Sequence, residues 1–351
     1  MSTAHFLIPG NPDRRTGGTI YDRRIMAGLA AQGWPVVLHR LDATFPVPTD
    51  AALAEAGAVF NTLPDQALTI IDGLALGALP EVAARHRDRL RLIGLVHHPL
   101  ALETGLNEVQ RQQLYASERD ALRQVRQVIV TSPSTARVLI DDYDVPPEYC
   151  VVVLPGTDPA PLATGSNRAE LVLLCAASLT PRKGHAVLLR ALAQLKDRAW
   201  RLQCAGSSAL DPVTAAGLQA LAEKLGLTDR IAWLGELESA DLNAAYQQAD
   251  IFVLPSFHEG YGMVLAEALA RGLPIVSTTA GAIPDTVPAA AGLLVPPGDE
   301  TALAEALARV IDEPDWRERL AAGARAARQT LPDWPAVSAQ FAGVLETVLA
   351  A

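Results

Sequence analysis

The sequence has few of the residues that mark a secreted or metal-binding protein. Only three of its 351 residues are cysteines, and Cys150, Cys175 and Cys204 are widely spaced in apolar surroundings, with no C-x-x-C pair. This pattern argues against a disulfide framework and against a thiolate metal site. We therefore expect three buried, reduced thiols and a cytoplasmic location.

Positive charge and long apolar runs are also lacking. The net charge is −10 and the pI is near 5.2, so the sequence has no basic excess to attract nucleic acid or anionic lipid. No apolar run approaches the roughly 20 residues of a membrane-spanning helix. The first residues lack the basic and apolar segments of a signal peptide. We expect no nucleic-acid partner and no integral membrane segment.

Several catalytic signatures are missing as well. The sequence contains no G-x-S-x-G, no G-x-x-x-x-G-K-[ST], no H-E-x-x-H and no D-x-D at an expected strand end. His97 and His98 are adjacent at the end of a predicted strand, where neighbouring side chains point to opposite faces, so a shared metal is not expected. The predicted metal content is none.

Short apolar runs alternate with helical patterns along the whole chain, which is typical of parallel α/β units. Predicted strands run from His5–Pro9 to Val151–Leu154 in the first half, with one at Ala58–Asn61, and from Leu171–Ala176 to Gly292–Val295 in the second. A linker rich in Pro, Gly, Ser and Thr occupies residues 155–167. We predict two Rossmann-like, doubly wound domains at 1–160 and 168–331 that face each other across a cleft, and a C-terminal helix in 332–351 that crosses back to the first domain.

The most informative segment runs from Pro255 to Val276 and contains Glu259 and Glu267, eight positions apart, around a glycine pair and a predicted helix start. Backbone N–H groups in such a loop can hold a phosphate while both carboxylates reach sugar hydroxyls. Taken alone, the same spacing also arises by chance in helical proteins.

Two further segments carry candidate phosphate contacts. Lys183 and Gly184 follow a predicted strand and open a helix, which suits a diphosphate clamp, although a solvated Arg182–Lys183 pair at a turn is the alternative. Gly17 and Gly18 separate the first strand from a helix, so a ligand can approach closely, but an ordinary helix-entry turn explains them as well.

Together these segments resemble the family 4 glycosyltransferases, retaining enzymes of the GT-B fold. The run from Pro255 to Val276 resembles the donor-binding signature of that family. Gly17-Gly18, His97, the segment 153–158, Pro181–Gly184, Ala280–Asp285 and Gly292–Asp299 resemble its other motifs, in the right order and across both domains.

The resemblance implies a nucleotide diphosphate sugar as donor substrate, a sugar acceptor and no cofactor. It places Glu259 at the donor sugar, Glu267 at the ribose, Lys183 and Gly18 at the diphosphate, and His97 beside the transferred sugar. The implied catalytic residues are His97, Lys183 and Glu259. The implied donor-binding residues are Gly17, Gly18, Arg182, Lys183, Glu259, Gly260, Tyr261, Gly262, Met263, Val264 and Glu267, and the acceptor-side residues are His97 and His98. Residues 231–236 are implied to line the base pocket.

Two departures from the family pattern stand out. Ala177-Ser178 occupies the place of the usual Gly-Arg, so Arg182 is left to supply that charge or to point into solvent. His97-His98 replaces a His-Asp pair, which suggests an altered acceptor side.

Two alternatives stay open beside a glycosyltransferase. One is a nucleotide-sugar epimerase or phosphorylase of the same architecture, and the other is a non-catalytic nucleotide-sugar-binding protein. Acidic and basic residues balance along the region 100–125, which favours a solvated helix face over membrane docking, so we expect a small, soluble acceptor. The donor base and the oligomeric state cannot be read from the sequence.

Overall fold

The computed structural model describes residues 2–351, and the chain divides into two compact units. Unit 1 runs up to Gly156 and includes Pro332–Ala351, whereas unit 2 is Thr157–Leu331. Each unit contains one six-stranded sheet in which all pairings are parallel. Among residues 2–351, no helix combines the length and the apolar character needed to cross a membrane.

The sheet of unit 1 has the order β2-β1-β3-β4-β5-β6. Its strands are β1 (Ala4–Pro9), β2 (Val36–Leu41), β3 (Leu68–Asp72), β4 (Arg91–Val96), β5 (Gln127–Val130) and β6 (Cys150–Val152). Its helices are α1 (Gly17–Ala31), α2 (Asp50–Thr62), α3 (Gly73–Leu76), α4 (Pro80–His86), α5 (Glu108–Leu122), α6 (Pro133–Asp142) and α14 (Trp334–Ala350), with 3₁₀ turns η1 (Leu100–Leu102) and η2 (Pro147–Tyr149).

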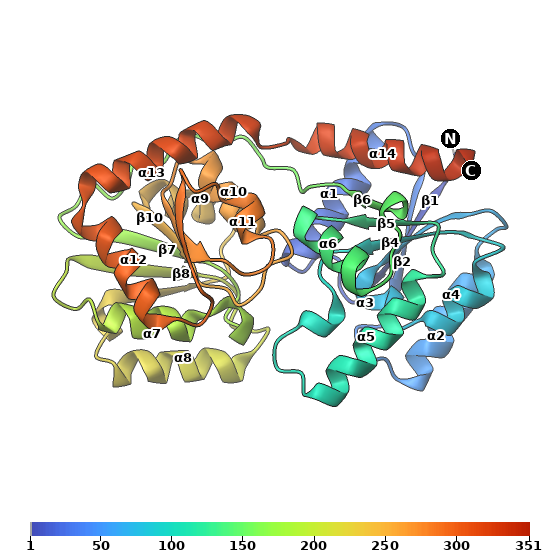
Figure 1. The fold of residues 1–351 in the computed structure, drawn as a ribbon, viewed down its shortest axis with the longest axis horizontal. Coiled ribbons are helices and arrows are strands. Elements are labelled where there is room, and N and C mark those ends of the chain that lie inside the picture. The colour runs from blue at the N-terminus through green and yellow to red at the C-terminus, as the bar shows by residue number, and fades with distance from the viewer. Residues whose placement is uncertain (1) are drawn as a thin grey trace. The chain divides into compact units, whose positions relative to one another are not determined.

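The first strand shows how this sheet is covered on both faces. Phe6 stacks on Phe341 of α14 with ring centroids 6.2 Å apart, whereas Leu7 joins the apolar cluster with Phe60 of α2 and Leu139 of α6. Successive strand residues point to opposite faces, so the sheet is buried on both sides. Helices α1 and α14 lie side by side on one face (Figure 1).

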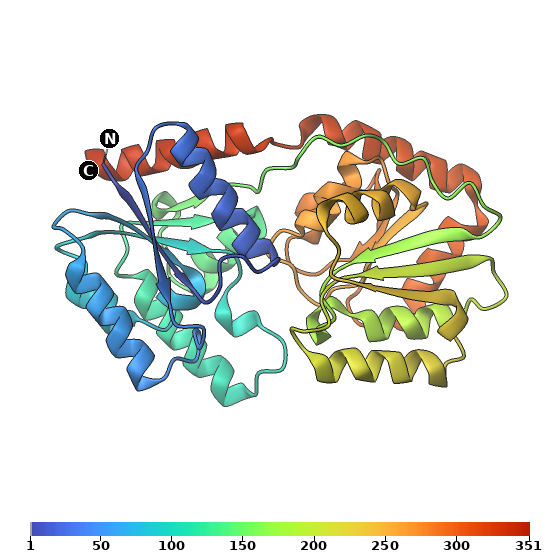
Figure 2. The ribbon, with the colours of Figure 1, turned by 180° about the vertical axis from the view of Figure 1, so that it is seen from behind.

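The sheet of unit 2 has the order β12-β11-β10-β7-β8-β9. Its strands are β7 (Leu171–Ala176), β8 (Trp200–Ala205), β9 (Ile231–Gly235), β10 (Ile251–Leu254), β11 (Ile275–Thr278) and β12 (Gly292–Val295). Its helices are α7 (His185–Ala193), α8 (Pro212–Lys224), α9 (Ser239–Gln248), α10 (Met263–Ala270), α11 (Ile283–Thr286), α12 (Glu300–Asp312) and α13 (Pro314–Ala327), with 3₁₀ turns η3 (Pro181–Lys183), η4 (Thr228–Arg230) and η5 (Arg328–Thr330). Helices α7 and α8 lie on one face of the sheet, and α9 and α10 lie on the other (Figures 1 and 2).

Both strand orders contain a point where the direction of winding reverses. In unit 2 this switch point lies between β7 and β10, which are hydrogen-bonded neighbours. In unit 1 it lies between β1 and β3. Ligands of open parallel sheets bind beyond the carboxyl ends of the strands at such points. The loops that follow these four strands are therefore the places to look for a site.

Three details differ from the sequence-based predictions. The strand predicted at Ala58–Asn61 is wrong, because these residues form the last turns of α2, where Ala56 and Phe60 are buried four residues apart. The thiol of Cys150 is half-buried, while Cys175 and Cys204 are buried. The second part of the predicted linker is fixed to unit 2, since the N–H of Ala163 donates to the carbonyl of Arg271 at 2.9 Å.

Candidate functional site

The loop after β7 carries Lys183 and rests on the end of β10. Pro181 begins the short turn η3, and Gly184 ends it with a φ of 71°. A Cβ atom on Gly184 would lie 2.0 Å from the carbonyl oxygen of Pro255, so only glycine allows this approach. The N–H of Phe257 donates to the carbonyl of Arg182 at 2.8 Å, which joins the two loops.

This junction brings the predicted charged residues together. Lys183 Nζ lies 2.6 Å from Glu259 Oε1, and Arg182 Nη1 lies 3.8 Å from Glu259 Oε2. The hydroxyl of Ser256 donates to Glu259 Oε1 at 2.6 Å, and Arg182 also donates to the carbonyl of His258 at 2.8 Å. Burial alone would raise the pKa of Glu259, but Lys183 and Arg182 outweigh it and hold that pKa below its usual value. Glu259 is therefore a carboxylate in a buried, positively charged setting.

The glycine-rich loop that follows leads into the N-terminus of α10. Gly262 precedes the helix with a φ of 85°, and no side chain caps the first turn. Uncapped N–H groups at a helix start carry partial positive charge and suit an anion. In this segment Gly260, Met263 and Val264 are half-buried, whereas Tyr261 and Gly262 are buried. Burial raises the pKa of Tyr261 to about 12, so its hydroxyl is neutral.

A second layer of residues fixes the loop from behind. The N–H of Ala282 donates to the carbonyl of Glu259 at 2.9 Å, and Thr286 Oγ1 donates to the carbonyl of Tyr261 at 2.7 Å. A Cβ atom on Gly281 would lie 2.3 Å from the backbone carbonyl oxygen of Glu259. The segment Ala280–Asp285 thus supports the backbone of the glycine-rich loop.

Glu267 lies on α10, one turn after its first residue, Met263, and eight positions after Glu259. The phenol of Tyr246, which is fully buried in α9, donates to Glu267 Oε2 at 3.0 Å. The guanidinium of Arg271 lies over the Tyr246 ring at 4.3 Å. Neither Tyr246 nor Ser256 was expected at the site, because their relation to the glutamates comes only from the packing of α9 and β10.

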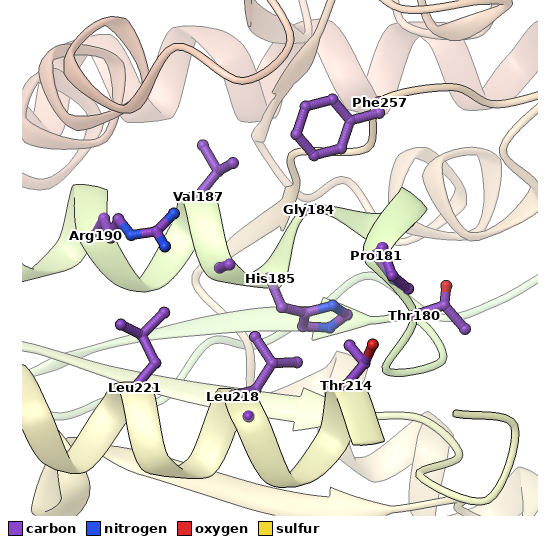
Figure 3. A pocket seen from close by; sticks show the side chains of 12 residues that line it. Thr180, Pro181, Gly184, His185, Val187, Arg190, Thr214, Leu218, Leu221 and Phe257 are labelled. Atoms are coloured by element: carbon purple, nitrogen blue, oxygen red, sulfur yellow. The ribbon is translucent and has the colours of Figure 1, made fainter. Parts of the chain in front are cut away.

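A cavity of about 480 Å³ lies beside the Lys183 loop, between α7 and α8. Its lining includes Pro181, Gly184 and His185, and Phe257 lies on the opposite side from α8 (Figure 3). None of the charged site residues lines it. Burial lowers the pKa of His185 to about 4, so that imidazole is neutral. The predicted base-pocket segment 231–236 coincides with β9 at the edge of the sheet.

A separate cluster forms in unit 1 around His97, directly after β4. Gly17 begins α1 after a capping box between Thr16 and Thr19. A Cβ atom on Gly18 would lie 3.2 Å from His97 Cδ2, so the glycine lets α1 pack closely on the ring. His98 turns away, and its Nε2 lies 3.9 Å from Glu103 Oε2.

Two acids complete this cluster, and the sequence reasoning missed both. His97 Nε2 lies 2.9 Å from Asp22 Oδ1 and 3.7 Å from Asp72 Oδ2. Asp22 lies one turn after Gly18 on the same helix face as the buried Ile25. A carboxylate among the apolar residues of a helix face is unusual, and it could have indicated a functional residue. Asp72 ends β3, which is where ligands of a parallel sheet bind.

The two acids alter the titration of the cluster. Burial by itself lowers the pKa of His97, but Asp22 and Asp72 outweigh it and place that pKa above its usual value. Burial and the nearby Asp22 raise the pKa of Asp72 to about 7. Asp22, Asp72 and His97 also offer three possible metal-ligand atoms within 4.8 Å of one another.

Comparisons with known proteins decide the family. The family model described as glycosyl transferases group 1 matches residues 161–327, and that of glycosyltransferase family 4 matches residues 70–161. The chain is 31% identical over 286 residues to the D-inositol 3-phosphate glycosyltransferase of Corynebacterium glutamicum (strain R), which covers 74% of this chain and 68% of that enzyme. This chain belongs to the family 4 glycosyltransferases.

Solved structures show that this family 4 glycosyltransferase has the GT-B fold. Sucrose-phosphate synthase (tll1590) from Thermosynechococcus elongatus is 23% identical, with a TM-score of 0.83 over 99% of both chains. Anabaena Alr3699/HepE in complex with UDP-glucose is 20% identical, with a TM-score of 0.77 over 98% of this chain and 99% of that one. Alignments with further curated relatives span about half of those relatives' length. The predicted fold class, family and enzyme class are confirmed, and the roles of single residues stay predictions.

Proposed function

We propose that this glycosyltransferase moves a sugar from a nucleotide diphosphate sugar to an acceptor with retention at the anomeric carbon. The observation that carries the proposal is the cluster of Lys183, Arg182 and Glu259 at the switch point of unit 2. Glu259 of this cluster belongs to the loop that leads into the uncapped start of α10. Two cations and free helix amides suit a diphosphate, while a buried carboxylate suits sugar hydroxyls.

The proposed chemistry assigns a role to each group. The bond between the anomeric carbon and the diphosphate breaks, and the acceptor oxygen bonds to the same face of that carbon. The acceptor hydroxyl gives its proton to a phosphate oxygen of the leaving group. Lys183, Arg182 and the amides of Gly260–Val264 stabilise the departing charge, with Gly17 and Gly18 as further phosphate contacts. Glu259 orients the sugar and Glu267 holds the ribose, without a metal or cofactor in the reaction.

The geometry of Arg182 supports its assignment as the phosphate arginine. Its side chain is only 25% exposed and lies beside Glu259, so it does not point into solvent. Ser178 stands where the family arginine is usual, and Arg182 follows four positions later in the same loop. Arginine can form two parallel bonds to one phosphate, which makes it a suitable replacement.

The first experiment is a thermal-shift screen of the whole chain with UDP, GDP, ADP and their sugars. A binding nucleotide raises the unfolding temperature in a concentration-dependent way. The Lys183→Ala variant should lose most of that shift, while Lys224→Ala on the exposed face of α8 keeps it. If no nucleotide diphosphate shifts the wild type, the donor site proposed here is wrong.

Two alternatives are separated by the products. A nucleotide-sugar epimerase or phosphorylase would change the donor without an organic acceptor, the phosphorylase needing only inorganic phosphate. A nucleotide-sugar-binding protein would bind the donor with no turnover across a broad acceptor screen. Retention is checked by proton NMR of the anomeric signal in the product.

We also propose a small, soluble acceptor and a cytoplasmic site of action. On α5, Arg111 pairs with Glu108 at 3.7 Å and Arg123 pairs with Asp120 at 3.0 Å, and all four side chains are largely exposed. Such mutual pairing supports a solvated helix face, because the arginines are already neutralised. His97 and His98 would lie on the acceptor side.

A further inference from the structure

The cluster of Asp22, Asp72 and His97 in unit 1 has features that its place in the family pattern does not explain. The three side chains come from α1, the end of β3 and the end of β4. Asp22 and Asp72 side chains are 2% and 6% exposed, whereas that of His97 is 20% exposed. The acids are thus buried behind the ring, and the ring is the member of the cluster that solvent and ligands can reach.

The hydrogen bonds give the ring a defined orientation. Among residues 2–351, the ring of His97 forms a hydrogen bond through Nε2, with Asp22 Oδ1 at 2.9 Å. A carboxylate only accepts, so this bond places a hydrogen on Nε2. One oxygen of Asp72 accepts from the N–H of Leu74 at 2.8 Å, and the other faces His97 at 3.7 Å. Nδ1 is left as the ring nitrogen for a ligand.

The charges around the ring favour one more proton. Asp22 Oδ2 is buried and has no hydrogen-bond partner in the described part of the chain. A buried carboxylate with an empty acceptor position is costly unless positive charge lies close by. The imidazole of His97, whose Nε2 lies 2.9 Å from Asp22 Oδ1, can supply that charge.

We propose that Asp22 is a positioning residue that, with Asp72 behind it, fixes His97 by its Nε2–H and keeps the ring protonated, so that Nδ1–H donates to an oxygen of the bound substrate. This inference rests on the proposed function for the identity of the substrate. It assigns His97 the role of a hydrogen-bond donor and excludes that of a general base.

The other groups that face the ring do not compete for this role. Tyr21 meets the ring edge-on with centroids 5.3 Å apart, but its hydroxyl donates to the carbonyl of Val153 at 3.1 Å. Burial raises the pKa of Tyr21 well above its usual value, so it stays neutral. The adjacent His98 lies near Glu103 instead. The acids that act on His97 are therefore Asp22 and Asp72, and both favour its cationic form.

The same three residues resemble a metal-ligand set, but the geometry favours a proton. Zinc binds the nitrogen lone pair of a neutral imidazole and leaves no hydrogen on that nitrogen. In this structure that same nitrogen, Nε2, is in hydrogen-bond contact with a carboxylate. A metal would have to displace this bond.

The decisive experiment is nitrogen-15 NMR of the histidines in the whole chain, titrated from pH 5 to pH 9. The chain has seven histidines, and the His97→Gln variant assigns the signal of interest. We expect His97 to titrate above an ordinary histidine and to keep its hydrogen on Nε2 when neutral. A neutral form with hydrogen on Nδ1, or an ordinary titration, would overturn the proposal without reference to any activity.

The Asp22→Asn variant tests the cause. The amide keeps the shape but loses the charge, so we expect the His97 titration to move to lower pH. An unchanged titration would show that Asp22 is not the cause. If this variant does not fold, Asp72→Asn is read in the same way, with a smaller expected shift. Stoichiometric zinc uptake by the wild type that Asp22→Asn abolishes would make the cluster a metal site and overturn the proposal.

The enzymatic readout separates positioning from general stability. We expect Asp22→Asn to lower kcat about 10- to 100-fold, the size of one charge-assisted hydrogen bond. KM for the donor should change much less than kcat, because the proposed donor contacts of Lys183, Arg182 and Glu259 are not altered. Activity should also decline at a lower alkaline pH than in the wild type. Asp120→Asn on the exposed face of α5 is the control. A kcat of Asp22→Asn equal to that of the wild type would refute the positioning role. If the wild type shows the expected NMR behaviour but no transferase activity, only the proposed function is refuted.

Discussion

At the scale of single residues, the Lys183–Glu259 pair sets the properties of the donor site. Both side chains are mostly buried, at 16% and 7% exposure. Removing one partner of a buried pair leaves an uncompensated charge and destabilises the fold, whereas removing both charges is much less costly. The pair therefore links stability to catalysis, and variants can separate the two.

We predict that Lys183→Ala lowers kcat about 10²- to 10³-fold, because one preorganised positive group is lost at the leaving phosphate. It should also lower the free energy of unfolding by about 2 kcal/mol, since Glu259 would then keep Arg182 and Ser256 as its partners among residues 2–351. Urea unfolding and steady-state kinetics measure the two effects.

The double variant Lys183→Ala, Glu259→Gln tests this account. It should recover most of the stability and none of the activity, because the buried charge is gone but the phosphate contact is not restored. Recovery of kcat in the double variant would contradict a direct role for Lys183. The exposed Lys224→Ala should match the wild type in both measurements.

Residue chemistry could be predicted where the contributing residues are close in sequence. Glu259, Glu267 and the glycines lie within one loop and helix, so the sequence groups them, and the companion motifs on both domains favoured a shared site over a chance spacing. Asp22, Asp72 and His97 are separated by 75 positions in all, and only the strand order brings them together. The reason is physical, since sequence periodicity reports which face a residue occupies but not which distant residue it meets.

At the scale of elements, the turn η3 depends on one glycine. Gly184 has a φ of 71° and faces the carbonyl of Pro255. We predict that Gly184→Ala lowers the free energy of unfolding by about 3 kcal/mol or more, because a left-handed backbone is unfavourable for alanine and the added atom would overlap the oxygen. Chemical denaturation with and without a nucleoside diphosphate measures the loss of stability and of binding.

The matched control is Gly57→Ala in α2. A Cβ atom there meets nothing within 4 Å, and alanine is favoured over glycine inside a helix. We expect this variant to be about 0.5–1 kcal/mol more stable than the wild type. Equal effects of the two substitutions would show that η3 is not constrained as described.

Helix α5 holds the turn η1 after the two histidines through a buried acid. Glu118 Oε2 accepts from the N–H of Leu100 at 2.8 Å. Burial raises the pKa of Glu118 to about 8, against the opposing effect of the hydrogen bond from Leu100. The folded chain therefore holds a proton that the unfolded chain releases above the ordinary pKa near 4.5.

The sign of the pH dependence follows from this difference. The contribution of Glu118 to the free energy of unfolding is fully present below about pH 4.5, and it declines as the pH rises to about 8. We predict that Glu118→Gln matches the wild type near pH 4.5 and is more stable at pH 8, by a difference on the order of 3 kcal/mol. Urea unfolding at several pH values measures it, and Glu108→Gln on the exposed face of α5 should show no such divergence.

Elements were predicted well where length and period agreed. The predicted strands Leu171–Ala176 and Gly292–Val295 and the helical segment Trp334–Ala350 coincide with β7, β12 and α14. The strand predicted at Ala58–Asn61 is wrong because these four residues continue a helical pattern that begins before them. Ala52, Ala56 and Phe60 recur every four residues, which is a helix period.

At the scale of the whole molecule, unit 1 is built from two distant parts of the chain. Its last helix, α14, packs along α1, where Trp334 meets Tyr21 at 6.1 Å between ring centroids and lies under the guanidinium of Arg24 at 5.4 Å. Composition indicates where the chain leaves the first unit, because Pro and Gly accumulate there. The helical pattern of residues 334–350 predicts the last helix, but it does not predict that this helix packs on α1, since that depends on an apolar face left open by the rest of the unit.

This architecture predicts that damage to the α1–α14 contact stays within unit 1. A Cβ atom on Gly28 would lie 1.9 Å from the hydroxyl oxygen of Ser338, so Gly28→Ala should force the two helices apart and cost about 1–3 kcal/mol. We expect faster amide hydrogen exchange in α1 and α14 and in the strands beneath them. Exchange in residues 157–331 should not change, because these residues form unit 2. Most of the stabilisation by a nucleoside diphosphate should also remain, because Lys183 and Glu259 belong to unit 2 and only the proposed contacts of Gly17 and Gly18 lie on α1. Gly343→Ala in α14 is the control, since a Cβ atom there meets nothing within 4 Å. Faster exchange throughout unit 2 in Gly28→Ala would mean that the two units fold as one cooperative body, and the donor site would then depend on α14 as well.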